Sequence, residues 1–195
     1  MATPGSGVPV TKEQLEKAKI VPGVVSSLGS ELVDLRVLYK ELEVVNGLAL
    51  RKAQTQIKPH VELHGPSAGS AHDFYTLLMV DPDAPSPTKP SFRNFLHWLV
   101  VNIPGSVAPS QEVWQLGQEG VEYMGPAPPE GEHRYVFLLF KQSSGDLKLE
   151  GLNKENRKSF DVEAFAKAHK LGPAIGGLYY VTTAHDELGH SGKQV

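Results

Sequence analysis

Three strand-length segments that are apolar at nearly every position constrain the fold of this chain more than any other feature. They are FYTLLMV (residues 74–80), FLHWLVVNI (95–103) and YVFLLF (135–140). A strand that is apolar on both sides needs both of its faces covered. The connections between the three segments are rich in Gly and Pro and carry little helix signal, which favours a central antiparallel sheet packed on both sides. The sequence therefore predicts a mainly β fold.

Weaker patterns add elements around this sheet. Further strands are expected over residues 31–39, 41–45, 57–63 and 174–181, and residues 65–73 form a surface loop. Pro59 places the third of these strands at an edge or at a strand start. The pair Asn46-Gly47 is typical of a hairpin turn. Two short helices are expected, one capped by Thr11 with Gln14 and one over FDVEAFAKAHK near the end of the chain, capped by Ser159 or Asp161.

Charged and polar side chains gather at the ends of the apolar segments. Asp81 and Asp83 directly follow the first segment, His97 lies in the second, and His133 lies just before the third. If the second and third strands start at the same end of the sheet, both imidazoles and both carboxylates meet at one rim. Side chains alternate along a strand. We therefore expect one face to hold Phe95, His97, Leu99 and Val101, the opposite face Leu96, Trp98 and Val100, and a shared face of the third strand His133, Tyr135, Phe137 and Leu139.

This combination of groups suits a ligand that carries both charges. A carboxylate beside an imidazole favours its protonation, and imidazolium N–H groups bind phosphate oxygens. Structural roles remain open for the same residues: Asp81 and Asp83 as caps of a Pro-rich turn, His97 as a hydrogen-bonded core histidine, and His133-Arg134 as a buried pair that neutralises Asp83. Arg93 and Arg134 are salt-bridge partners or ligand contacts.

Composition excludes several classes of function. The 195 residues suffice for one domain, and the net charge of −3 gives no basic face for nucleic acid. The absence of cysteine excludes disulfides and thiolate nucleophiles. The HExxH pattern is absent, and His185 and His190 are spaced off a common helical face, so we expect no metal and no cofactor. The alternative to a binding protein is an acid–base hydrolase that uses Asp81, His97 and His133.

The sequence also predicts the domain organisation and the compartment. The longest apolar runs are about six residues, too short to cross a bilayer. The first ten residues lack the pattern of a signal peptide. We expect a flexible N-terminus over residues 1–10, a single domain over 11–181 and a polar flexible tail over 182–195. Cytoplasm is the expected compartment, with the nucleus as a second one.

Two stretches carry a family resemblance. DPDAPSP with RNFLHW, and GPAPPEGEHRY, resemble the two signature regions of the phosphatidylethanolamine-binding protein family. This family includes the Raf kinase inhibitor proteins and the plant florigen, terminal-flower and mother-of-florigen proteins. The similarity extends from about Glu43 to about Tyr180, and the residues of these motifs most resemble the plant-type branch. It implies a large central antiparallel sheet packed against a smaller sheet, with a C-terminal helix.

The resemblance also implies a function and a site. Members are non-enzymatic binding and regulatory proteins with a pocket for phosphate, phosphoethanolamine or a phospholipid head group. The corresponding ligand-binding residues here are Asp81, Asp83, Pro85, Phe95, His97, Gly125, Pro128, Pro129, His133, Tyr135 and Tyr180. The three prolines are expected to stiffen the rim. Family members act on signalling partners: animal members restrain kinases, and some fungal and animal members inhibit serine proteases.

One partner surface departs from the family pattern. Several plant members dock 14-3-3 proteins through an arginine, an aromatic residue and a basic residue. The corresponding places here are His60, Leu116 and the neighbourhood of Gly145-Asp146. These residues lack the bidentate donors that bind phosphate or carboxylate. We therefore expect 14-3-3 binding to be weak or absent.

Overall fold

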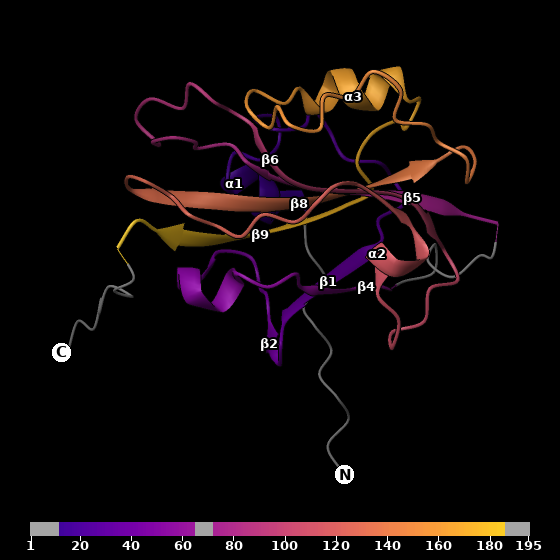
Figure 1. Ribbon diagram of the computed structural model, residues 1–195, viewed down its shortest axis with the longest axis horizontal. Coiled ribbons are helices and arrows are strands. Elements are labelled where there is room, and N and C mark those ends of the chain that lie inside the picture. The colour runs from indigo at the N-terminus through magenta and orange to yellow at the C-terminus, as the bar shows by residue number, and fades with distance from the viewer. Residues whose placement is uncertain (1–11, 65–71, 186–195) are drawn as a thin grey trace, which may run out of the picture.

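A six-stranded sheet forms the centre of the computed structural model, which describes residues 12–64 and 72–185. Its strand order is β3-β9-β8-β5-β6-β7, and a smaller sheet has the order β2-β1-β4. Figure 1 shows the helix α3 above the large sheet and the small sheet below it. The elements are α1 (Lys12–Lys17), β1 (Asp34–Tyr39), β2 (Leu42–Glu43), β3 (Leu48–Ala49), the 3-10 helix η1 (Lys52–Thr55), β4 (His60–His64), β5 (Phe74–Asp81), β6 (Phe95–Pro104), α2 (Val113–Leu116), β7 (Gln118–Val121), β8 (Glu132–Gln142), α3 (Val162–Ala168) and β9 (Gly176–Thr183).

The three strongly apolar segments form the middle of the large sheet, as β5, β6 and β8. Strand β5 lies between the other two and is antiparallel to both. Strands β6 and β8 therefore run in the same direction, and their starting ends lie on either side of the end of β5. This confirms the predicted antiparallel sheet and the predicted rim.

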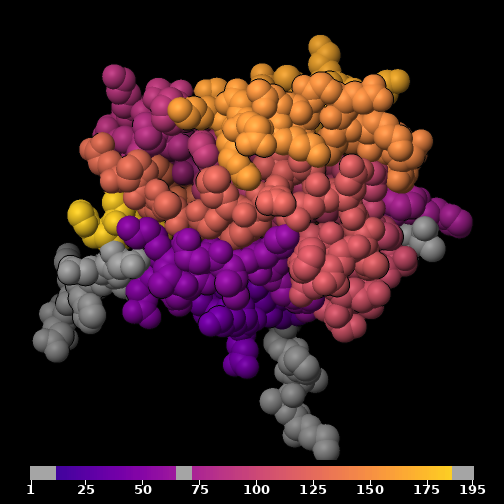
Figure 2. All heavy atoms as spheres, in the orientation of Figure 1, coloured from indigo at the N-terminus to yellow at the C-terminus, as the bar shows by residue number. Residues whose placement is uncertain are grey.

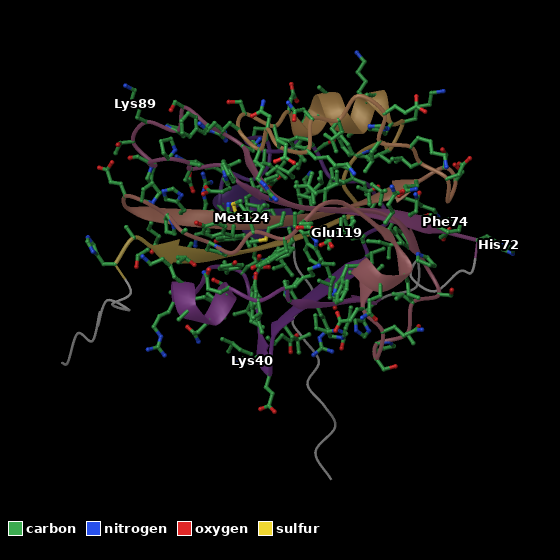
Figure 3. All side chains as sticks on the ribbon, viewed as in Figure 1. Lys40, His72, Phe74, Lys89, Glu119 and Met124 are labelled. Atoms are coloured by element: carbon green, nitrogen blue, oxygen red, sulfur yellow. The ribbon has the colours of Figure 1, made fainter. Side chains whose placement is uncertain are left out.

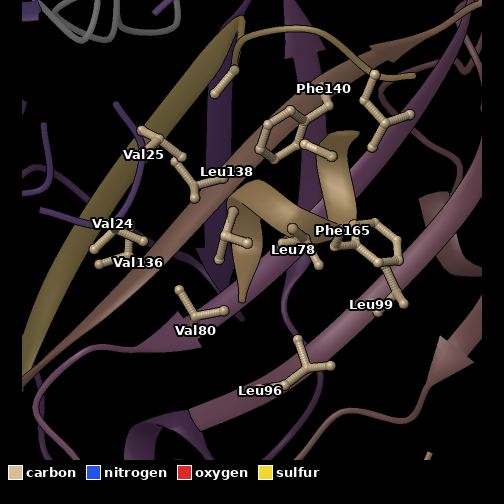
Figure 4. Packing of buried hydrophobic residues seen from close by; sticks show 14 of the residues in the cluster. Val24, Val25, Leu78, Val80, Leu96, Leu99, Val136, Leu138, Phe140 and Phe165 are labelled. Atoms are coloured by element: carbon tan, nitrogen blue, oxygen red, sulfur yellow. The ribbon is translucent and has the colours of Figure 1, made fainter. Parts of the chain in front are cut away.

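Both faces of the large sheet are covered, as the apolar pattern predicted. On one face Leu78 and Leu138 pack with Leu15 of α1 and Phe165 of α3 (Figure 4). On the other face, residues of β5, β6, β8 and β9 share one apolar cluster with residues of the small sheet, including Val37. Burying an aliphatic or aromatic side chain of this size stabilises the fold by about 1.5–3 kcal/mol.

The predicted alternation along β6 is wrong on one side of His97. Leu96 lies in the same apolar cluster as Leu99, and Trp98 lies in the opposite one. The cause is a β-bulge: consecutive residues of β5 pair with Trp98 and Leu96, so His97 is an extra residue in the ladder. The bulge turns His97 to the same side as Trp98, where its ring lies 5.1 Å from the ring of Tyr135.

The predicted hairpin at Asn46-Gly47 is also wrong. Strand β2, before the turn, pairs with β1, whereas β3, after the turn, pairs in parallel with β9. The turn therefore carries the chain from the small sheet to the large one. Gly47 has a φ of 78°, which favours glycine, and the Asn46 side chain accepts a hydrogen bond from the backbone N–H of Tyr179 at 3.0 Å.

The ends of other elements agree with the sequence in most places. Asp161 caps α3 by accepting a hydrogen bond from the backbone N–H of Ala164 at 2.9 Å. Strand β4 begins directly after Pro59 and lies at an edge of the small sheet. Strand β9 runs two residues beyond the predicted end, to Thr183.

Some predictions fall outside the described residues. These are the cap at Thr11, the flexibility of residues 1–10, most of the loop 65–73 and the tail beyond residue 185. Within the described part of the chain, every helix is too short or too polar to cross a membrane.

Candidate functional site

Five polar side chains, from three central strands and the loop after β5, meet at one rim of the large sheet. We call Asp81, Asp83, His97, His133 and Arg134 the rim cluster. Asp81 ends β5, His97 is the bulged residue of β6, and His133 is the second residue of β8. The exposed fractions of Asp81, Asp83, His97 and His133 are 3%, 7%, 4% and 0%. The structure thus brings together both carboxylates and both imidazoles that the sequence singled out.

His133 is bound through both ring nitrogens. Its Nδ1 lies 2.7 Å from Oδ2 of Asp81, and its Nε2 lies 3.0 Å from the carbonyl oxygen of Glu130. Because a carbonyl can only accept, Nε2 donates there. Burial alone would lower the pKa of His133, but the hydrogen bond and the negative charge of Asp81 outweigh it and raise the pKa above the ordinary value of 6.5. His133 is therefore the histidine of this rim that holds a charge.

Asp83 is held by Arg134 rather than by His133. The carboxylate of Asp83 accepts three hydrogen bonds from Arg134: from the backbone N–H at 2.9 Å, from Nε at 2.8 Å and from Nη2 at 2.6 Å. Burial alone would raise the pKa of Asp83, but these bonds outweigh it and lower the pKa. The backbone N–H of Asp83 also donates to Oδ1 of Asp81 at 2.8 Å. The two acidic residues thus have separate cationic partners.

His97 has the opposite electrostatic character. Its Nδ1 donates to the carbonyl oxygen of Met124 at 2.7 Å, which leaves Nε2 as the unprotonated nitrogen of the neutral ring. Burial lowers the pKa of His97, and the carbonyl of Met124 and the charge of Asp81 only partly offset this effect. Within residues 12–64 and 72–185, Nε2 makes no hydrogen bond. The rim thus contains one charged histidine and one neutral histidine.

Aromatic rings form one side of the rim cluster. The ring of Tyr135 lies 5.1 Å from that of His97 and 6.5 Å from that of His133. Tyr180 stacks on Tyr135 at 5.4 Å, and the ring of Phe95 lies 5.1 Å from His97. All three aromatic residues that were predicted for the site therefore contact one another or a histidine of the rim.

The hydroxyl of Tyr180 is directed into a separate hydrogen-bonded chain. It lies 3.0 Å from the hydroxyl of Tyr39, which lies 2.7 Å from that of Tyr123. Tyr123 donates to the carbonyl oxygen of Thr55 at 2.7 Å. Burial raises the pKa of Tyr39, Tyr123 and Tyr180. Tyr180 therefore offers the rim only its ring.

The other predicted site residues lie in the loops that frame the rim cluster. A Cβ atom added at Gly125 would lie 2.9 Å from Oε1 of Gln56, so glycine permits this loop to pack closely against the segment after η1. Pro128 is buried and Pro129 exposed, and the peptide bond before Pro85 is cis. In the described part of the chain these four residues make no hydrogen bond with a side chain of the rim cluster.

Thr182 belongs to this site and was not predicted. It pairs directly with His133 in the β8–β9 ladder, so the two side chains lie on the same face. Its hydroxyl oxygen is buried and has no hydrogen-bond partner in the structure. Such an unsatisfied group costs about 1–3 kcal/mol. The alternation from Tyr180 to Thr182 is the signal that could have indicated it.

Two backbone carbonyls, of Met124 and Glu130, fix the protonated nitrogens of the histidines, and nothing in the sequence marks them. Among the described residues, no group of three or more His, Asp or Glu side chains is placed to hold a metal ion.

Comparison with known proteins places this geometry in a family. The family model "Phosphatidylethanolamine-binding protein" matches residues 40–180. Protein MOTHER of FT and TFL1 homolog 2 of rice is 41% identical over 158 residues, which are 77% of this chain and 86% of the relative. Protein FLOWERING LOCUS T of Arabidopsis thaliana is 36% identical over 187 residues, 89% of this chain and 96% of the relative.

Solved structures agree with the sequence comparisons. The phosphatidylethanolamine-binding protein of Plasmodium vivax aligns with a TM-score of 0.75 at 25% identity, covering 92% of this chain and all of that one. A carboxypeptidase Y inhibitor, solved with its cognate proteinase, has a TM-score of 0.71 at 25% identity and covers 89% of this chain and 94% of its own. The chain belongs to the phosphatidylethanolamine-binding protein family.

Proposed function

We propose that this protein is a non-enzymatic binding and regulatory protein whose rim cluster holds phosphate or a phosphoethanolamine-type head group. The observation that carries the proposal is unused hydrogen-bonding capacity in a cluster that is otherwise fully bonded. Nε2 of His97 and the hydroxyl of Thr182 have no partner in the described residues. A buried hydroxyl such as that of Thr182 is rarely left unbonded unless water, an ion or a ligand completes it.

The charges of the rim cluster permit an anion to approach. The Asp83–Arg134 pair is neutral, and the Asp81–His133 pair is neutral while His133 holds its proton. An anion is then not repelled by the two carboxylates. When His97 takes up a proton at low pH, its Nε2–H donates to a phosphate oxygen, and the remaining lone pairs of Asp81 attract the ammonium of phosphoethanolamine.

In this proposal the two histidines have different roles. Both ring nitrogens of His133 are already bonded to Asp81 and Glu130, so His133 acts by neutralising Asp81 rather than by direct contact with the ligand. His97 provides the direct contact. Anion affinity should therefore fall as pH rises, first because His97 loses its proton and then because His133 leaves Asp81 uncompensated.

The test compares His97→Gln with a matched variant at a histidine outside the rim, His60→Gln. Phosphate and phosphoethanolamine are titrated into each protein by calorimetry at pH values from about 5 to 9, the range that brackets histidine titration. His97→Gln should weaken binding about tenfold, the effect of one hydrogen bond to a charged group, and should flatten the pH dependence. His60→Gln should bind like the unaltered protein. Equal affinities for all three proteins contradict the proposed site.

The alternative is an acid–base hydrolase, since a carboxylate beside an imidazole is general acid–base equipment. Incubation with p-nitrophenyl phosphate and with a lysophospholipid separates the two functions. Saturable binding without turnover supports the binding protein. Turnover that His97→Ala abolishes supports the hydrolase instead.

We further propose that the protein regulates development or signalling through a protein partner, in the cytoplasm and also in the nucleus. Support comes from the names of its relatives, which include FLOWERING LOCUS T and TERMINAL FLOWER 1 of Arabidopsis thaliana. Binding to 14-3-3 should be weak or absent. Both ring nitrogens of His60 already have partners: Nδ1 lies 3.1 Å from Oε1 of Glu112, and Nε2 lies 2.8 Å from the carbonyl oxygen of Pro109. A dissociation constant at or below about 1 μM, about −8 kcal/mol, in a 14-3-3 titration contradicts this expectation.

A further inference from the structure

Arg157 lies outside the rim cluster, beside the start of β6. It belongs to the segment before α3, which forms one wall of a groove of about 880 Å³ beside β7. Figure 2 shows the orange residues of that segment against the salmon-coloured residues that include β7. Arg157 is partly buried, whereas residues 153–156 and Lys158 are exposed. Arg157 is thus the least exposed charged residue of this wall.

The backbone of the segment fixes Arg157 against β6. The backbone N–H of Leu96 donates to the carbonyl oxygen of Arg157 at 2.7 Å, and that of Phe160 donates to the carbonyl oxygen of Asn94 at 2.8 Å. Strand β7 pairs with β6 only from Leu99 onward. The segment before α3 therefore takes the place of a neighbouring strand at the start of β6.

The guanidinium of Arg157 binds the β-bulge itself. Its Nη1 donates to the carbonyl oxygen of Leu96 at 3.2 Å and to that of His97 at 3.0 Å. Successive residues of a regular antiparallel strand direct their carbonyls to opposite edges. Two consecutive carbonyls can meet one nitrogen here because the bulge turns both to the same side. Arg157 therefore stabilises the irregularity that turns His97 into the rim.

This contact distinguishes Arg157 from the other charged residues of the groove. Among the described residues, Arg157 is the one whose side chain donates to the carbonyls of the bulge. Nζ of Lys158 lies instead 4.2 Å from the centre of the Phe92 ring. Glu119, labelled in Figure 3, lies 2.7 Å from Nζ of Lys58. Proximity to the groove is therefore shared by several charges, whereas contact with the bulge belongs to Arg157.

Met124 completes the hold on His97. Its backbone N–H donates to the carbonyl oxygen of His97 at 2.9 Å, and its own carbonyl oxygen accepts from Nδ1 of the ring at 2.7 Å. Together with Arg157, Met124 thus fixes both the main chain and the ring of His97. The position of Nε2, the ring atom that the proposed ligand needs, follows from these contacts.

Charges on three elements act on the ring of His97. Burial is the largest influence and lowers the pKa of His97, while the carbonyl of Met124 and the charge of Asp81, at the end of β5, raise it. The positive charges of Arg157, before α3, and of His133, on β8, lower it. The guanidinium that holds the bulge therefore also opposes a proton on the ring.

Other ionisable groups near His97 do not replace this effect. Tyr135 of β8 lies beside the ring, and burial raises the pKa of its hydroxyl, so it stays neutral. Burial lowers the pKa of Arg157, and the negative charges of Glu122, after β7, and Glu155 oppose this effect. Arginine stays protonated in proteins, so its charge acts on His97 throughout the range in which histidine titrates.

We propose that Arg157 is a positioning residue for ligand binding at the rim, because its guanidinium holds the bulge that directs His97 into the site and its charge opposes a second charge on that ring. This role rests on the proposed function, in which Nε2–H of protonated His97 binds the anion. Arg157 acts through His97 rather than by contact with the ligand. It has two separable effects: it strengthens binding by the protonated rim, and it lowers the pH above which the anion is released.

The first measurement is an NMR titration of the His97 ring in the ligand-free protein, assigned as the signal that His97→Gln lacks. Arg157→Gln removes the charge, so the pKa of His97 should rise. Arg157→Lys keeps the charge, so the pKa should stay near that of the unaltered protein. Lys158→Gln removes a neighbouring charge that does not contact the bulge and should also leave the pKa unchanged. An unchanged titration in Arg157→Gln overturns the proposal, because a merely structural arginine would not move it.

Calorimetry with inorganic phosphate, from pH about 5 to 9, measures the effect on binding. At the low-pH plateau Arg157→Gln should bind about tenfold more weakly, the lower end of the cost of losing an outer partner of a metal-binding histidine. Its affinity should also persist to higher pH. Arg157→Lys should lose plateau affinity without this change in pH, since lysine lacks the planar fork. Lys158→Gln should match the unaltered protein.

The unfolding midpoint of each variant is measured first. If Arg157→Gln is unfolded, Arg157→Lys decides the positioning role, and an affinity equal to that of the unaltered protein overturns it. A loss in Lys158→Gln as large as in the arginine variants also overturns it, because any charge of the groove would then serve. If the unaltered protein binds no phosphate, the proposed function fails, and the NMR titration still decides whether Arg157 controls the charge of His97.

Discussion

Two histidine–carboxylate clusters in this molecule have similar bond lengths and very different surroundings. At the rim, Nδ1 of His133 lies 2.7 Å from Asp81, and the side chains are 0% and 4% exposed. On β4, Nε2 of His64 lies 2.7 Å from Glu62, and the side chains are 36% and 13% exposed. His60 adds a contact with Glu112 at 3.1 Å. We call these four residues of β4 and the segment before α2 the β4 cluster.

The comparison shows that burial, rather than distance, sets the energetic weight of such a pair. Two unit charges about 4 Å apart interact with about 1 kcal/mol in water and about 4 kcal/mol at the effective dielectric constant of about 20 that describes charge pairs in proteins. An exposed pair contributes about 0–1 kcal/mol and is screened by salt. A buried pair contributes little net energy, but removing one partner leaves an uncompensated charge. The same substitution should therefore have unequal effects in the two clusters.

The largest effect is expected for Asp81→Asn. This change leaves the buried imidazolium of His133 without its counter-ion, so the free energy of unfolding should fall by roughly 3 kcal/mol. The corresponding change in the β4 cluster, Glu62→Gln, also removes the ion pair with Arg36 at 2.8 Å, and it should still cost no more than about 1 kcal/mol because these pairs are partly exposed. Urea unfolding of both variants at neutral pH measures the difference. Equal losses would show that burial does not separate the two clusters.

The two histidines of the rim should contribute to the pH dependence of stability with opposite signs. The pKa of His133 is raised in the folded state, so its contribution is full below the ordinary value of 6.5 and is lost as pH rises through the raised pKa. The pKa of His97 is lowered, so its contribution is present above 6.5 and is lost as pH falls through the lowered pKa. The two histidines partly cancel in the unaltered protein.

Replacing either histidine should therefore reveal the pH dependence of stability that the other one contributes. In His97→Gln, stability should decline more steeply with rising pH than in the unaltered protein, and in His133→Gln it should decline with falling pH. Unfolding free energies measured across the histidine range test this. Parallel profiles for the unaltered protein and both rim variants would contradict the assigned charge states.

How far the sequence predicts this site depends on what kind of interaction places each residue. The rim could be predicted because the apolar segments are covered on both faces, and Asp81 directly ends one of them. Placing His97 requires a bulge, which is set by the pairing of β6 with β5 and leaves no mark in the alternation of β6 itself. The predicted faces were therefore right for Tyr135 and Phe137, but Leu96 shares a face with Leu99 and His97 shares one with Trp98, which the sequence did not predict.

For a related reason, the sequence could not predict which acidic and basic side chains of the rim pair with each other. His133 and Arg134 are neighbours, and either could neutralise Asp83; only the approach of the loop after β5 assigns Arg134 to Asp83 and His133 to Asp81. The turn at Asn46-Gly47 shows the same limit. Local turn chemistry was read correctly, but the strands that flank the turn find their partners in different sheets, which is a tertiary outcome.

A smaller effect of opposite sign is expected at Thr182. Replacing its unpartnered, buried hydroxyl by a methyl group in Thr182→Val should stabilise the ligand-free protein by up to about 1 kcal/mol, because no hydrogen bond is lost. Thr76→Val is the matched change at a buried threonine that donates to Oε1 of Gln142 at 2.8 Å, and it should destabilise by about 1 kcal/mol. Thermal unfolding of both variants gives the two signs. If Thr182→Val also destabilises, its hydroxyl has a partner and the argument from unused capacity at the rim fails there.

The smallest effect is expected in the β4 cluster itself, for His60→Gln. The imidazole of His60 is partly exposed, and its pairing with Glu112 is open to screening by salt. The loss in unfolding free energy should stay below about 1 kcal/mol and should shrink as ionic strength rises. The loss for Asp81→Asn should change little with salt, since both side chains of that pair are almost fully buried. Unfolding series at low and high salt therefore separate the two clusters even if their losses at a single condition are alike. A His60 effect that is large and insensitive to salt would place this histidine in the same class as the buried pair.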